Sequence, residues 1–510
     1  MIELPDEILS FIFILASDED LLFNHGLPTT MSTSAWFKNA IGNWTLRQPS
    51  EALNVLQRRS YSTKRNIKDT CRTFHRIAEE LMFNCLFFNG PEKLSYLCAE
   101  LDKTQVDPPR GWWTKRIHVT CYNAKSFLDV EAATSLSTIL RHCRNTEIVM
   151  LAIPSTVESL TLVADTLYNF NRNLRTLHLS LPTTALDKLI WLLSGLPNLG
   201  FAHFSFTSPT DLSPDEEDCP ELGCAEEIEI ALPRLTQLSL YGHTGPFIEQ
   251  ACQWKLPALR FLSLNTVHSD IIPFLDVYGR GLVYLDVTCT TSVRMDAVFS
   301  RCPNLETICF NADWTQEEEL RHDNIRNVGL HGLGLAFTPP SGGRPPIFPL
   351  DSMIRRANDS NFKSLMAEGH FPKIERVRML STAVLMELER NGGPCKPQPR
   401  GEYEYVDELE DGLKRWETWW DICEKANVRL EDCTGGPLGV LPLEESDLEE
   451  ETNEEDEAEA SEESDEEWEE YSWEYEVPPI DEGGSTTSGV EELRKLIEEC
   501  RQMEADRDVF

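Results

Sequence analysis

A leucine pattern that recurs at a nearly constant interval constrains the fold of this chain more than any other feature. Five copies of Leu-x-x-Leu-x-Leu, some with another apolar residue at a leucine position, begin at Leu174, Leu235, Leu259, Leu282 and Leu305. The last three steps are 24, 23 and 23 residues, and weaker copies begin at positions 148, 199, 325 and 374. Apolar residues two apart favour a short strand with one buried face.

Helix-like segments separate these expected strands, for example at 185–193, 247–252 and 295–300. A period of 20–29 residues with this leucine signature is typical of the leucine-rich repeat. The expected fold class is therefore α/β, with a solenoid over residues 110–390. Repeats must stack, because no single repeat can bury its own apolar edge. The alternative is a general α/β domain in which the leucine spacing is accidental.

The solenoid hypothesis predicts a binding surface. Strand alternation sends the leucines into the core and the residues between them onto the concave face, which is the usual recognition surface of such solenoids. The candidate binding residues are His178, Gln237, Tyr241, Phe261, Tyr284, Asp286 and Thr307. Tyr241, Phe261 and Tyr284 fall on neighbouring strands and suit an exposed aromatic patch. The alternatives are that these aromatics only cover strand edges, or that a loop lies over them.

The first fifteen residues predict a short helix that is apolar on nearly every side. Pro5 suits a helix start, and Asp6 and Glu7 place negative charge in the first turn. A helix that is apolar all round must be covered all round, yet this one is shorter than the ~20 apolar residues that cross a bilayer. One face is expected to pack on its own domain and the other to bind a second protein. Residues 66–81 carry a further apolar stripe with the spacing of one helix.

Two N-terminal patches carry a family resemblance. The start Leu4-Pro-Asp-Glu-Ile-Leu9, combined with Thr70-Cys-Arg-Thr-Phe-His-Arg-Ile-Ala78, resembles the F-box of fungal F-box proteins. The resemblance covers residues 4–22 and 64–88, and residues 23–63 are an insertion that an ordinary F-box lacks. It implies the adaptor-binding residues Leu4, Pro5, Ile8, Leu9, Ile12, Cys71 and Phe74. The alternative is a set of buried helices in an unrelated N-terminal domain.

With the repeats that follow, the chain is similar to the F-box/leucine-rich-repeat proteins. This resemblance implies the substrate-recognition subunit of an SCF-type E3 ubiquitin ligase, with a Skp-type adaptor and a cullin scaffold as partners. Residues 1–90 would dock the adaptor, and the concave face would bind a protein substrate. The chain is then not an enzyme, and it contains no His-Glu-x-x-His, Gly-x-Ser-x-Gly or P-loop motif. No cofactor or metal is expected, because the 15 cysteines are scattered and form no Cys-x-x-Cys pair.

The end of the chain is strongly acidic. Residues 441–480 hold 20 Asp and Glu and no Lys or Arg, which is half of the formal net charge of −40. Such a block is expected to be disordered, to repel nucleic acid and membranes, and to attract basic proteins. The expected domains are an F-box-like helical module (1–90), the solenoid (110–390), a tryptophan-rich cap (400–435), the acidic tail (436–489) and a C-terminal amphipathic helix (490–510).

Leucine-rich repeats followed by an acidic tail are also similar to the acidic leucine-rich nuclear phosphoproteins. That likeness implies a scaffold or chaperone for basic proteins such as histones, and a tail that only keeps the chain soluble is a further alternative. No apolar run reaches bilayer length, and the first residues lack the basic region and cleavage site of a secretory signal. The expected location is cytoplasmic, nuclear or both.

Overall fold

The computed structural model describes residues 4–17, 19–32, 35–38, 44–47, 49–103, 109–121, 127–207, 222–266, 270–288, 294–311, 321–331, 360, 362–367, 369–380 and 409–438. Apart from residues 436–438, the expected acidic tail lies outside the described residues. The helix expected at 490–510 and the end of the expected solenoid at 381–390 lie outside them as well.

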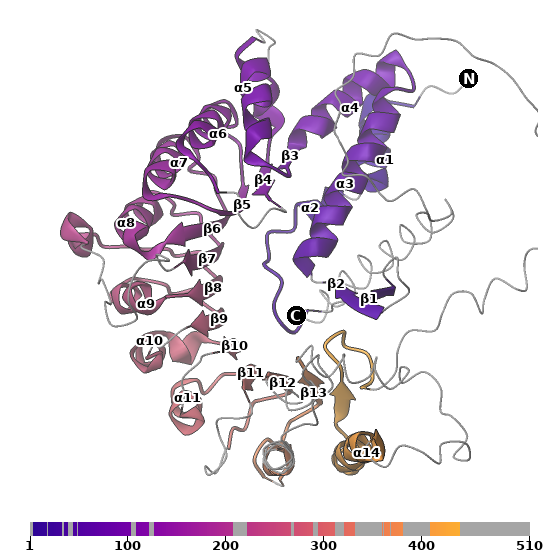
Figure 1. Cartoon of the computed structure of the whole chain (residues 1–510), viewed down its shortest axis with the longest axis vertical. Helices are drawn as coiled ribbons and strands as arrows, with labels where there is room; N and C mark the ends of the chain where they lie inside the picture. Colours follow the sequence, from indigo (N-terminus) through magenta and orange to yellow (C-terminus); the bar gives the residue numbers. More distant parts are fainter. Residues whose placement is uncertain are drawn as a thin grey trace, which may run out of the picture.

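A twelve-stranded parallel sheet dominates the described structure, and each strand lies beside the next one along the chain. The strands are β3 (Cys85–Phe88), β4 (Arg116–Thr120), β5 (Ile148–Pro154), β6 (Thr176–Pro182), β7 (Phe201–Thr207), β8 (Gln237–Gly242), β9 (Phe261–Thr266), β10 (Tyr284–Val287), β11 (Thr307–Asn311), β12 (Asn327–His331), β13 (Arg376–Met379) and β14 (Arg429–Glu431). The predicted α/β class is confirmed. Figure 1 shows the strands along the inner side of an arc.

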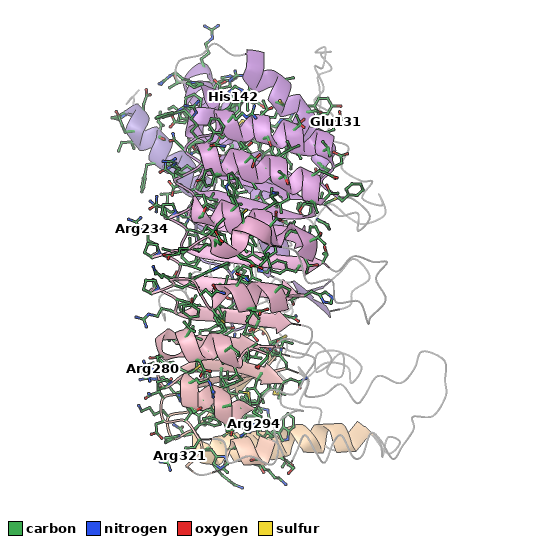
Figure 2. The ribbon with its side chains drawn as sticks, turned by 90° about the vertical axis from the view of Figure 1, so that its left-hand side faces the viewer. Glu131, His142, Arg234, Arg280, Arg294 and Arg321 are labelled. Carbon is green, nitrogen blue, oxygen red and sulfur yellow. The ribbon has the colours of Figure 1, made fainter. Side chains whose placement is uncertain are left out.

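Helices cover the outer side of the sheet, where they stack one above another (Figures 1 and 2). They are α5 (Leu94–Lys103), α6 (Val130–His142), α7 (Val157–Phe170), α8 (Leu186–Ser194), α9 (Gly245–Ala251), α10 (Ile272–Tyr278), α11 (Met295–Arg301) and α14 (Leu409–Ala426). Short 3-10 helices are η1 (Pro91–Lys93), η2 (Arg110–Trp113), η3 (Thr183–Ala185), η4 (Gly223–Glu227) and η5 (Gly279–Gly281). One apolar core between sheet and helices runs from Leu86 to Leu438.

The leucine pattern places the strands well. Each of the five strong copies supplies a strand that begins two residues after its first leucine, as β8 begins at Gln237 after Leu235. The predicted start of the weak copy at position 148 is two residues too late. Ile148 pairs with Thr176, which is the third residue of its own repeat and lies two residues after Leu174. Ile148 and Val149 are neighbours and both buried, so the apolar spacing did not show where this repeat begins.

The N-terminal part is mainly helical. It consists of α1 (Asp6–Ala16), α2 (Glu19–Leu22), an antiparallel hairpin of β1 (Ala35–Lys38) and β2 (Trp44–Arg47), α3 (Pro49–Lys68) and α4 (Arg72–Asn84). The single helix predicted at 66–81 is wrong, because Cys71 has extended backbone angles and separates α3 from α4. α4 runs directly into β3, so the first strand of the sheet lies inside the range expected for the N-terminal module.

Glycine at position 242 is required by the turn that ends β8. Its φ is +81°, and a Cβ there would lie 2.1 Å from the carbonyl oxygen of Phe206. We expect Gly242→Ala to lower the free energy of unfolding by about 2–4 kcal/mol. Both the left-handed backbone conformation and the clash with the Phe206 carbonyl would destabilise the folded alanine variant. Gly223 is the control, since its φ is +51° and no atom lies within 4 Å of its would-be Cβ. Gly223→Ala should lower the free energy of unfolding by only about 1–2 kcal/mol. If chemical denaturation shows the same loss for both variants, the clash at position 242 does not contribute.

Candidate functional site

One face of α1 and the residue before Pro5 present an apolar stripe to solvent. Its residues are Leu4, Ile8, Phe11, Ile12 and Leu15, with exposed fractions from 44% for Ile12 to 59% for Phe11. They are spaced three or four apart and therefore lie on one side of the helix. Exposed apolar residues scattered singly are ordinary on a protein surface, whereas a contiguous stripe marks an interaction site.

The opposite face of α1 packs on the helical module. Leu9, Phe13 and Ile14 meet Ile67 of α3 and a group from α4: Phe74, Ile77 and Leu81. The rings of Phe13 and Phe74 meet edge to face, with centroids 4.8 Å apart. An exposed ion pair between Asp6 and Arg76 joins the start of α1 to α4. Because one face is anchored in this way, the exposed stripe is held in a defined position.

The seven predicted adaptor-binding residues divide into two groups. Five are exposed: Leu4, Pro5, Ile8, Ile12 and Cys71. Leu9 and Phe74 instead pack between α1 and α4. Sequence reasoning missed Phe11 and Leu15, although their spacing from Ile8 and Ile12 was a signal that placed them on the same face.

The predicted insertion at 23–63 contains an unexpected element. Residues 22–32, which we call the strap, run across the inner face of the sheet between α2 and the hairpin, along the inner side of the arc in Figure 1. Four strap carbonyls accept hydrogen bonds from side chains of the sheet: those of Leu22, His25, Leu27 and Met31. The donors, in the same order, are Arg116 of β4, Thr176 of β6, Gln237 of β8 and Arg378 of β13. The inner face thus holds the main chain of an extended segment.

Gln237 makes the most specific of these contacts. Its amide nitrogen donates to the carbonyl of Leu27 at 2.9 Å, and its amide oxygen accepts from the Leu27 N–H at 3.1 Å. One side chain therefore satisfies both polar groups of one strap residue. Such a paired contact contributes roughly 1–3 kcal/mol in total.

The C-terminal end of the strap enters a pocket formed by β9, β10, β11 and the residue after β13. The Thr30 hydroxyl lies 2.8 Å from the Tyr284 hydroxyl and donates to a carboxylate oxygen of Asp286 at 2.7 Å. Met31 is 2% exposed and clusters with Tyr284 and Cys309, with Phe261 and Leu380 packed around them. This end of the strap is anchored by both polar and apolar contacts.

Polar contacts attach the N-terminal module to the first strands. Gln57 of α3 donates through its amide nitrogen to Nδ1 of the buried His118 at 3.0 Å. A buried ion pair, Lys64 to Glu19 at 2.6 Å, joins α3 to α2 just before the strap begins. The strap therefore leaves from a helix that is fixed to the rest of the module.

The seven residues predicted on the concave face have different environments. Four are buried: Gln237, Tyr284, Asp286 and Thr307. The first three contact the strap directly. His178 and Phe261 are half-buried, and Tyr241 is 48% exposed. The predicted open patch is wrong at Tyr284, because the strap lies over that residue, as in the alternative in which a loop covers the aromatics.

His118 makes the stability of the inner face depend on pH. Burial, and secondly the nearby Arg116, lower the pKa of His118 from 6.5 to about 3. Below pH 6.5 the unfolded chain binds a proton that folded His118 rejects, so stability falls as the pH falls toward 3. We expect a slope of about 1.4 kcal/mol per pH unit from this residue. Denaturation of the wild type and His118→Gln between pH 4 and 7 checks it, and identical slopes would contradict it.

A groove of about 640 Å³ lies between the N-terminal helices and the edge of the sheet where β4–β8 begin. Its charged lining combines Lys115, Arg175 and Arg234 with Glu80 and Glu147. Figure 2 shows Arg234 on the same edge of the stack as Arg280 and Arg321. Both signs of charge therefore line the groove.

Comparison with known proteins adds no assignment: no family model matches the chain, and no curated protein matches it. Within the described ranges, no group of three or more His, Cys, Asp or Glu side chains is placed to hold a metal ion. In the same ranges no helix is both long and apolar enough to cross a bilayer. Two candidate binding sites remain, the exposed α1 stripe and the inner face under the strap.

Proposed function

We propose that this chain is a non-catalytic substrate receptor of an SCF-type ubiquitin ligase. An F-box-like module docks a Skp-type adaptor, and a leucine-rich-repeat solenoid carries the substrate site. The observation that carries the proposal is the α1 stripe, because five large apolar side chains remain about half exposed in the segment that resembles the F-box. Such a receptor contributes proximity, since it holds a substrate lysine near a ubiquitin carrier supplied by other subunits.

The α1 stripe offers enough apolar surface for a partner. Fully burying a large aliphatic or aromatic side chain contributes about 1.5–3 kcal/mol. Five side chains that are about half exposed therefore offer about 4–7 kcal/mol, before the cost of association. The anchored opposite face of α1 lowers that cost, because little of the helix remains to be ordered on binding.

The sheet supports the solenoid part of the proposal. Twelve parallel strands follow one another in chain order, with helices on the outer side. The repeat starts from 235 to 305 are 24, 23 and 23 residues apart, within the range of the leucine-rich repeat. Each strand and helix then form one unit that buries its apolar edge on the next unit.

The test is co-expression of the full chain with a Skp-type adaptor, followed by size-exclusion chromatography. The full chain is needed because Gln57 and the strap contact the sheet, so a fragment of residues 1–90 loses those contacts. We expect a stoichiometric complex, and with cullin added a ternary one. If the folded chain forms no adaptor complex, the proposal fails. Salt-sensitive binding of a basic protein through residues 441–480 would then favour the scaffold alternative.

A further inference from the structure

The strap is held in a manner that suits exchange with another peptide. Four of its carbonyls are bound by side chains of the sheet, and these contacts depend little on the identity of the bound residues. In the middle of the strap, the His25 side chain also lies 3.3 Å from Glu147 and stacks on Phe201. Asn24, Gly26 and Pro28 are exposed, so the middle of the strap contributes no buried side chain at these positions. Only its ends are deeply buried, at Leu22 with 1% and Met31 with 2% exposure. A segment with few buried apolar contacts opens before the sheet does.

The pocket at the end of the strap contacts side chains of the strap as well as its main chain. Asp286 and Tyr284 contact a hydroxyl, that of Thr30. Next to it, an apolar pocket receives the unbranched thioether of Met31. A hydroxyl residue followed by a long, flexible apolar residue satisfies both contacts at once.

Gly329 on β12 makes room for this occupant. A Cβ at that position would lie 2.7 Å from the sulfur of Cys309, 2.7 Å from Cδ1 of Leu380 and 3.1 Å from the Met31 sulfur. Its backbone φ is not in the left-handed region. Glycine is therefore required here by the packed side chains of Cys309, Leu380 and Met31 together, and not by the backbone conformation.

We propose that the inner face is a binding site for an extended protein segment, and that the strap is a built-in competitor for it. The segment carries a hydroxyl residue followed by methionine or a similar long apolar residue, and it binds by displacing residues 22–32. The partner is a protein whose unfolded tail or loop supplies this segment. That this partner is the ubiquitination substrate rests on the proposed function; the peptide binding itself does not.

A strap-replaced variant tests the proposal directly. In the full chain, residues 24–31 are replaced by a Gly/Ser segment of equal length. The probe is a fluorescent synthetic peptide of residues 22–32. We expect the variant to bind it at least tenfold more tightly than the wild type does. Met31→Asp in the peptide should weaken binding at least tenfold.

Two outcomes would overturn the proposal. One is no binding by a strap-replaced variant whose thermal transition shows that it is folded. Another is equal binding of the peptide with Met31→Asp, which would mean that the pocket is not used. Adaptor binding by the same preparations separates the two proposals, since an intact adaptor complex without peptide binding contradicts only this one.

Hydrogen exchange of the wild type provides a second measurement if the strap-replaced variant does not fold. The amide of Leu27, bonded to Gln237, reports opening of the strap. We expect it to exchange at least tenfold faster than the amides of β8 to β10. If the Leu27 amide exchanges only as slowly as the amides of those strands, the strap is a permanent part of the core and the proposal is overturned.

Discussion

Arg378→Leu is expected to lower the free energy of unfolding by about 3–5 kcal/mol. Two nitrogens of Arg378 donate to one carboxylate oxygen of Glu431, at 2.9 and 2.8 Å, and a third donates to the carbonyl of Met31. The side chains of Arg378 and Glu431 are 1% and 3% exposed. Within the described ranges, leucine would leave the buried Glu431 with only the exposed Arg429 as its ion-pair partner, and Met31 without this donor. Chemical denaturation of the full chain measures the loss.

Arg326 on the surface provides the matched control. Its pair with Glu375 spans 3.3 Å, and the two side chains are 52% and 63% exposed. Arg326→Leu should cost less than about 1 kcal/mol, because water already solvates both charges. The double variant Arg378→Met, Glu431→Met should recover much of the lost stability, since no buried charge remains. A double variant no more stable than Arg378→Leu would contradict this explanation.

Ile8→Asp is expected to weaken adaptor binding by at least about 100-fold, which corresponds to roughly 2.7 kcal/mol. Ile8 lies in the middle of the exposed α1 stripe and is 47% exposed in the free chain. The aspartate remains hydrated in the free protein, so the melting temperature should change little. In a complex that covers the stripe it would be buried without a partner. Calorimetry or surface plasmon resonance with a Skp-type adaptor measures the change.

Val277→Asp on α10 is the control for this result. Val277 is also an exposed apolar residue, at 51%, but it lies on the outer helix layer, away from α1. Its replacement should leave adaptor affinity unchanged. If Ile8→Asp and Val277→Asp bind the adaptor as tightly as the wild type, the stripe is not the docking surface. If both lose binding, a general effect of added charge explains the loss.

Local patterns in the sequence predicted much of the fold. The leucine spacing identified β6 and β8 to β11, because each repeat must place its apolar side chains toward the same core. Apolar residues at Ile8 and Ile12 identified the stripe for a similar reason, since a short helix can bury only one face on its own domain. The same patterns erred where two neighbouring residues are both buried, as at Ile148 and Val149.

The strap was not predictable from such patterns. Residues 22–32 have no helix or strand period, and their bonding partners are far away in the sequence. Thr30 binds Tyr284 and Asp286, and Met31 binds Arg378, which is 347 positions further along the chain. Nothing near Tyr284 in the sequence indicates that it will be covered. The expected open aromatic patch was therefore wrong at Tyr284, even though its strands were placed correctly.

The sequence by itself determined the repeating α/β architecture and the apolar face of α1, because both arise from interactions between residues close together in the chain. Only the tertiary structure decided that the inner face of the sheet is filled by residues 22–32. That outcome depends on side chains from four separate strands, which come together on one surface only when the sheet has formed. The free energy of these contacts depends on how the strands are arranged in space, so it cannot be assigned to any single segment of the chain.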